Sequence, residues 1–137
     1  MRSSPLRVVS LAVALLVVNG FAHAAPARNI YPLQQVKAGQ RAVAKSVFKG
    51  TKIETFHVEI LGVIHKFEGT RSVILARILD GPVVARKSGV IEGMSGSPVY
   101  LGGKLVGAIA YGWSFSKEPI IGIQPITAMI KALVAQE

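Results

Sequence analysis

The chemistry that this sequence could support is concentrated in residues 93–98, whose sequence is Gly-Met-Ser-Gly-Ser-Pro. Two glycines, two hydroxyls and a proline favour a tight polar loop. A serine at the tip of such a loop, flanked by free backbone N–H groups, can act as a nucleophile beside an oxyanion hole. Ser95 is therefore the candidate nucleophile, and a glycine-rich turn without catalytic role is the alternative.

The segments that must position this loop have the apolar–polar alternation of β-strands. Residues 41–65 predict a hairpin with its turn at 49–52, and residues 72–79 predict a largely buried strand. The remaining predicted elements are a three-residue strand between Gly89 and Gly93, a hairpin centred on Gly102-Gly103 whose return strand runs from 104 to about 112, a short strand at 120–124, and a C-terminal helix with Pro125 in its first turn. These elements predict a small, mainly β, mostly antiparallel domain with a C-terminal helix.

The two faces of the long second strand differ in character, because successive side chains point to opposite sides of a sheet. Phe56, Val58, Ile60 and Ile64 are expected on the buried face. The other face carries Thr55, His57, Glu59 and His65. In an extended strand His57 and His65 would lie roughly 26 Å apart, so they cannot share a metal ion, and we expect no metal site.

The first residues have the pattern of a secretory signal peptide. Arg2 and Arg7 precede an apolar run at 8–18, and Ala22-His23-Ala24 has the small-x-small pattern of a cleavage site. We therefore expect a signal peptide at 1–24, a single domain at 25–137 and export to the periplasm or the exterior. The run is short for a membrane span, so no stable membrane anchor is expected after cleavage; an uncleaved anchor is the alternative.

Composition narrows the function further. The chain has no cysteine, which excludes disulfides, a thiol nucleophile, thiolate metal sites and a lipidated cysteine. Its formal net charge is +9, which favours anionic surfaces such as envelope lipids or acidic polymers. The basic residues are scattered and are not interleaved with aromatics, so we expect no nucleic-acid partner. No cofactor is expected either.

The loop at 93–98 resembles known hydrolase motifs to different degrees. The Gly-x-Ser-x-Gly elbow of α/β-hydrolases does not fit, because position 97 is serine and a hairpin, not a helix, follows. The Gly-x-Ser-Gly-x-Pro loop of chymotrypsin-like proteases fits better, although Met94 stands where those proteases usually carry an acid. The sequence resembles the SpoIVB peptidase family most closely, in residues 93–99, in Gly-Lys-Leu-Val-Gly-Ala at 103–108, and in the run at 50–58.

This resemblance implies a role for each candidate site residue. Ser95 would be the nucleophile, and the N–H groups of Gly93 and Ser95 would bind the oxyanion. Asp80, fifteen residues before Ser95, would be the acid that orients the base, and a turn-opening Asx residue is the alternative for it. The family's catalytic histidine lies in a Gly-His motif that this chain lacks. His57 is the remaining candidate base, and an ordinary surface histidine is the alternative.

Chain length also limits what the domain can contain. Chymotrypsin-like catalysis uses two six-stranded barrels, whereas about 90 residues of β structure build one. The fold expected from the resemblance is a small antiparallel barrel or half-barrel like one half of such a protease, with exposed edges. A protein or peptide would be the substrate, and a second half-domain would supply the histidine. The alternative function is a noncatalytic peptide-binding or interaction module, with its edge strands and the Trp113 loop as the binding surface.

Overall fold

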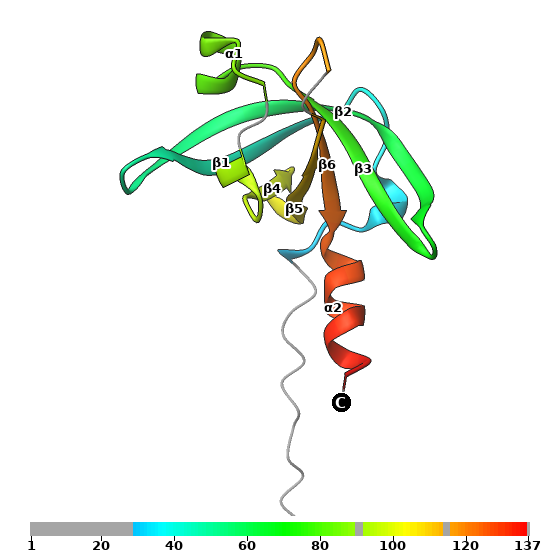
Figure 1. The fold of residues 1–137 in the computed structure, drawn as a ribbon. Helices are drawn as coiled ribbons and strands as arrows, with labels where there is room; N and C mark the ends of the chain where they lie inside the picture. The colour runs from blue at the N-terminus through cyan, green and yellow to red at the C-terminus, as the bar shows by residue number, and fades with distance from the viewer. Residues whose placement is uncertain (1–28, 90–91, 114–115, 137) are drawn as a thin grey trace, which may run out of the picture.

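The computed structural model describes residues 29–89, 92–113 and 116–136. Its centre is a closed antiparallel barrel in which six strands follow the order β1-β2-β3-β6-β5-β4 (Figure 1). The strands are β1 (Arg41–Lys49), β2 (Lys52–Glu68), β3 (Arg71–Ile78), β4 (Pro98–Leu101), β5 (Lys104–Gly112) and β6 (Ile120–Pro125). Helix α2 (Ile126–Val134) leaves the end of β6 and extends away from the barrel (Figure 1). The predicted mainly β fold with a C-terminal helix is confirmed, and the closed barrel is its form.

The barrel interior is filled by the inward-facing residues of the alternating strands. Ala42 and Ala44 on β1 and Phe56, Val58 and Ile60 on β2 are at most 1% exposed. β3, β4, β5 and β6 complete the core with Ile74, Ala76, Ile78, Val99, Leu101, Val106, Ile109, Ile121 and Ile123. The period-two pattern of the sequence therefore sets which face of each strand is buried.

The alternation expected for β2 fails after Ile60. A bulge lies between Ile60 and Gly62, where the pairing with β3 shifts register. The extra residue moves Val63 against the core and leaves Ile64 39% exposed. The placement of Ile64 on the buried face was therefore wrong, because a bulge exchanges the two faces of the strand beyond it.

The hairpin of β4 and β5 has its turn at Gly102-Gly103, as predicted. Both glycines have positive φ, at 54° and 76°, which suits the tight turn between twisted strands. Gly107 on β5 is required for another reason: a Cβ atom there would overlap the backbone carbonyl of Gln124 on β6. Close approach of these two strands thus depends on the missing side chain.

Two segments differ from the expected elements. Helix α1 (Pro82–Arg86) follows β3 where no element was predicted. The predicted strand between Gly89 and Gly93 falls mostly on residues 90–91, outside the described part of the chain, and Glu92 belongs to the 3-10 helix η3 (Glu92–Met94), so that prediction was wrong at Glu92. A further 3-10 helix, η2, spans Leu33–Gln35.

The two ends of the domain bear on other expectations. Pro125 has extended φ and ψ and caps α2 instead of lying in its first turn. The predicted signal peptide at 1–24 lies outside the described residues. Among the helices of the described part, none has the length and apolar character needed to cross a membrane.

The sequence predicted exposed strand edges, but closure of the barrel pairs each strand on both sides over at least part of its length. β1 pairs with β2 along its length but with β4 only through Val43–Tyr100 and Ala44–Val99. From residue 45 onward the second edge of β1 lies outside the β1–β4 ladder. The hairpin of β1 and β2 accordingly projects from the barrel (Figure 1).

Candidate active site

Ser95 lies on an exposed turn whose neighbours are firmly anchored. The N–H of Gly96 donates to the carbonyl of Ile109 at 2.7 Å, and the N–H of Ile109 donates to the carbonyl of Ser97 at 2.9 Å. Met94 is buried, 1% exposed, and its carbonyl accepts from the N–H of Ser97 at 3.1 Å. The chain therefore enters the core before and after Ser95, and presents this serine to solvent between the two anchors.

A pair of buried hydroxyls fixes the loop to β1. The Oγ of Ser97 donates to the Oγ of Ser46 at 2.8 Å, and the two residues are only 8% and 6% exposed. This contact was missed in the sequence. A signal was present, because Ser46 shares the inward face of β1 with Ala42 and Ala44, and a polar residue on a buried face needs a partner.

His57 and Asp80 come together at the end of β3. The Nδ1 of His57 lies 2.7 Å from Oδ2 of Asp80, and the backbone N–H of His57 donates to Oδ1 at 2.7 Å. Gly81, at φ +83°, turns the chain tightly against Phe56 just after Asp80. His57 lies on the exposed face of β2, as expected, but a carboxylate now holds one of its ring nitrogens.

This pairing has electrostatic consequences for Asp80. Partial burial raises the pKa of Asp80, but the hydrogen bonds from His57 and the attraction of its imidazole outweigh that effect, so the pKa lies below its ordinary value. Asp80 is therefore a carboxylate at neutral pH. An ionised carboxylate on Nδ1 leaves Nε2 of His57 as the nitrogen that can accept a proton.

The structure does not join Ser95 to this pair. Within the described residues, no hydrogen bond links Ser95 to His57 or Asp80, and the groove that contains Ser95 is lined by neither of them. The structure thus brings together two of the three predicted catalytic side chains. Gly93 and Ser95, the expected oxyanion donors, both line that groove.

The Ser95 groove is a hollow of about 470 Å³ between the β1–β2 hairpin and the loop before β4. One wall is formed by Gly93, Ser95, Gly96, Ser97 and Pro98. The hairpin contributes Lys45, Ser46, Val47 and Ile53, and Tyr100 of β4 also lines the groove. This groove is where a substrate would have to lie to meet Ser95.

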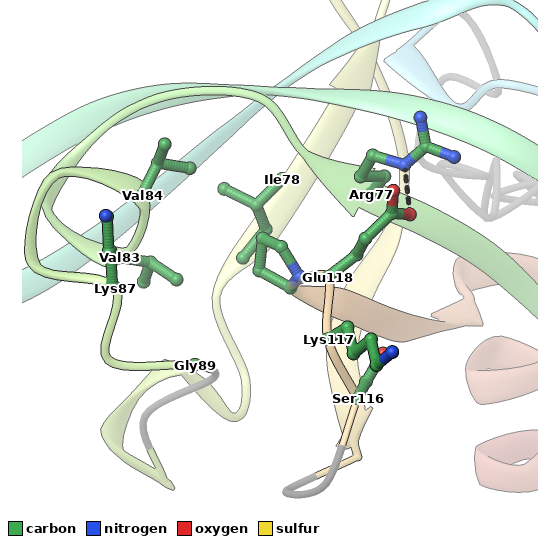
Figure 2. A pocket seen from close by; sticks show the side chains of 10 residues that line it. Arg77, Ile78, Val83, Val84, Lys87, Gly89, Ser116, Lys117 and Glu118 are labelled. Carbon is green, nitrogen blue, oxygen red and sulfur yellow. Dashed lines mark ion pairs between the residues drawn. The ribbon is translucent and has the colours of Figure 1, made fainter.

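A second hollow, of about 490 Å³, lies between the end of β3, α1 and the segment before β6 (Figure 2). Ile78, Val83 and Pro119 give it an apolar lining. Nε of Arg77 is 2.9 Å from Oε2 of Glu118, although its N–H is not aligned with that oxygen. Neither Ser95 nor the His57–Asp80 pair lines this hollow.

Other candidate groups make no cluster. His65 lies near Ser72, with 3.3 Å between Nδ1 and Oγ. The described residues contain no group of three or more histidine, aspartate and glutamate side chains placed to hold a metal ion. Trp113, directly after β5, is 38% exposed, and residues 114–115 of the same loop lie outside the described part of the chain.

The fold is similar to that of a solved protein, and the sequence matches a protein family. Among solved structures, the chain is similar to Rv3671c from M. tuberculosis H37Rv, solved as a serine-to-alanine mutant in an inactive form, with 16% identity and a TM-score of 0.59. The match covers 83% of this chain and 55% of that one, so this chain spans about half of that neighbour's length. A search of curated proteins found no significant match. A model of the SpoIVB peptidase S55 family matches residues 21–126, which is most of the chain, and the chain therefore belongs to the SpoIVB peptidase family.

Proposed function

We propose that this chain is an exported serine endopeptidase domain in which Ser95 is the nucleophile and the N–H groups of Gly93 and Ser95 stabilise the oxyanion. The observation that carries the proposal is the exposed Ser95 on an anchored turn that opens into a groove. Membership of a peptidase family indicates protein substrates. The leader pattern at 1–24 favours substrates in the cell envelope or outside the cell, and the excess of basic residues that remains without Arg2 and Arg7 favours anionic ones.

The reaction would follow acyl transfer through a serine ester. Oγ of Ser95 forms a bond to the carbonyl carbon of the scissile peptide while its proton passes to a base. The carbonyl oxygen becomes an oxyanion that the two N–H groups stabilise. Collapse of this intermediate breaks the C–N bond, and the leaving amine takes the proton. Water then cleaves the acyl-enzyme by the same two steps and restores Ser95.

We infer that the base comes from another segment or chain. Two observations support this: Ser95 has no hydrogen bond to His57 within the described residues, and the chain spans about half the length of its structural neighbour. A second half-domain packed beside the groove would bring the missing histidine. His57 is the alternative base, because Asp80 already holds its Nδ1 and would orient it.

Labelling with a fluorophosphonate probe tests the nucleophile. With lysate from its source added to supply the base, the full chain should be modified at Ser95, and Ser95→Ala should not be modified. Ser88→Ala, which changes an exposed serine outside the groove, should be modified like the wild type. If no modification of Ser95 occurs in the chain alone or with lysate from its source added, the enzyme reading is wrong.

The same label identifies the base. If His57→Ala abolishes modification while circular dichroism shows the fold intact, His57 is the base. Modification that persists in His57→Ala and rises when a histidine-bearing partner is added places the base outside the barrel. His65→Ala serves as the matched control, because His65 is also exposed on β2.

A noncatalytic peptide-binding module is the second candidate. The isolation of Ser95 from a hydrogen-bonded base favours it, since a serine hydroxyl without a base is a weak nucleophile. In that case the chain would bind peptides, would not cleave them and would not react with the phosphonate. The closed barrel restricts the free edge available for such binding to the part of β1 beyond β4.

A further inference from the structure

The β1–β2 hairpin forms one wall of the groove that contains Ser95. β1 leaves its ladder with β4 after Ala44, and the hydroxyls of Ser46 and Ser97 make the next contact between the two segments. Past that contact the groove lies between the hairpin and the loop that carries Ser95. The hairpin is thus placed to touch a polypeptide that has reached the nucleophile.

Two large aliphatic side chains of the hairpin face this groove. Val47 and Ile53 are register partners across β1 and β2, so they lie side by side on one face. They are 43% and 68% exposed, among the most exposed large apolar residues described. Their position in the same groove as Ser95 gives this exposure a role, because an apolar group of a bound chain would remove both from water.

The charge of the groove is positive. Lys45 lines it, with its ammonium 5.6 Å from the ring centroid of Tyr100. Lys49 and Lys52 are register partners at the end of the hairpin and lie outside the lining of the groove. Among the groove-lining residues whose side chains the structure describes, none carries a carboxylate. A ligand with a carboxylate next to an apolar side chain would be complementary to this surface.

The second hollow also has a cation beside apolar side chains, because Lys87 lines it together with Val83 and Val84. Figure 2 shows the cationic ends of Arg77 and Lys117 pointing away from its apolar lining. The guanidinium of Arg77 is already in contact with Glu118. This hollow also lacks Ser95.

We propose that the β1–β2 hairpin is a specificity subsite, at which an extended segment of the substrate packs an apolar residue on Val47 and Ile53 and places an adjacent acidic residue near Lys45. This assignment rests on the proposed function, because the hairpin becomes a substrate subsite only if Ser95 meets the same chain. Beyond Ala44 the edge of β1 lies outside its ladder with β4, and past the contact of Ser46 with Ser97 it would pair with an extended peptide, as strand edges do in peptide-binding domains.

A titration followed by NMR tests the subsite without catalysis. The ¹⁵N-labelled full chain with Ser95→Ala is mixed with the octapeptide Gly-Ser-Gly-Leu-Glu-Gly-Ser-Gly, for which we expect a Kd of about 1 mM. Shifts should concentrate in residues 45–53 and 95–97. Peptides with Ser replacing Leu, or with Lys replacing Glu, should bind at least about five-fold more weakly, which corresponds to roughly 1 kcal/mol.

Variants of the hairpin separate the two contacts. Val47→Ser combined with Ile53→Ser should remove the preference for Leu over Ser, and Lys45→Glu should reverse the preference for Glu over Lys. Leu133→Ser and Lys131→Glu are matched controls, since both positions are exposed on α2 away from the groove. Neither control should change the Kd.

Three results would overturn the subsite: no binding at millimolar peptide, shifts centred on α2 or on the hollow beside Pro119, or equal Kd values for the three peptides. Failure of the proposed function gives a different result, namely an unmodified Ser95 in the wild-type labelling experiment. Since the titration uses Ser95→Ala, binding is measured whether or not the wild-type serine is reactive.

Discussion

The hydroxyl pair of Ser46 and Ser97 should behave as one energetic unit. Both residues are less than 10% exposed, and their Oγ atoms are 2.8 Å apart. Ser46→Ala leaves the hydroxyl of Ser97 buried without its acceptor, and Ser97→Ala leaves Ser46 without its donor. A buried hydroxyl that loses its partner costs about 1–3 kcal/mol, whereas removal of both partners can be nearly neutral. We therefore expect each single variant to lower the free energy of unfolding by about 1.5 kcal/mol.

The double variant measures the pair directly. If Ser46→Ala and Ser97→Ala together cost no more than either alone, the coupling energy in the cycle is about 1.5 kcal/mol. Urea denaturation followed by circular dichroism gives the three values. Ser72→Ala is the control, because its contact with His65 is exposed and should be worth less than about 0.5 kcal/mol. If the double variant costs the sum of the two single variants, the reasoning is wrong, because additive effects mean that the two hydroxyls do not interact.

Three other outcomes can be tested with the same urea assay. Gly107→Ala should lower the free energy of unfolding by about 3 kcal/mol, because its Cβ would overlap the Gln124 carbonyl; Gly93→Ala, with open space at its Cβ, should change it by less than about 0.5 kcal/mol. Asp80 has a lowered pKa in the folded state, so its carboxylate stabilises the fold above the ordinary pKa of about 3.9, and this stabilisation is lost as the pH falls through the folded-state value. When the pH falls from about 6 to about 3, the free energy of unfolding should therefore decrease less in Asp80→Asn than in the wild type. The difference between the two decreases should be below about 1 kcal/mol, because both side chains of the pair are half exposed. Leu133→Ser should be neutral within about 0.5 kcal/mol, because Leu133 is 69% exposed on α2.

Local patterns in the sequence predict the strands well. The alternation over 41–48 predicts β1, and the glycine pair at 102–103 predicts the turn between β4 and β5. Both patterns depend only on residues that are neighbours in the sequence. Helix α1 was missed because five residues are too few to show a helical period. The bulge after Ile60 was missed because it is defined by pairing with β3, which the sequence of β2 alone does not specify.

Contacts within the candidate site are harder to predict because they join distant residues. His57 and Asp80 are 23 residues apart, and Ser46 and Ser97 are 51 apart. Each contact requires the register of two or more strands to be known to the residue. The loop around Ser95 was predicted from its own residue types, and its position against β1 follows only once the barrel closes.

Barrel closure beside Ser95 has a dynamic consequence. The β1–β4 seam contains only two residue pairs and is continued by the Ser46–Ser97 contact. Strands joined by so few backbone bonds separate at lower free energy than the long β2–β3 ladder. If β1 and β4 separate here, the loop that carries Ser95 moves away from the hairpin. The geometry around Ser95 therefore depends on the same equilibrium as the local opening of the barrel. Amide hydrogen exchange at the seam therefore reports the fraction of molecules in which the groove is assembled.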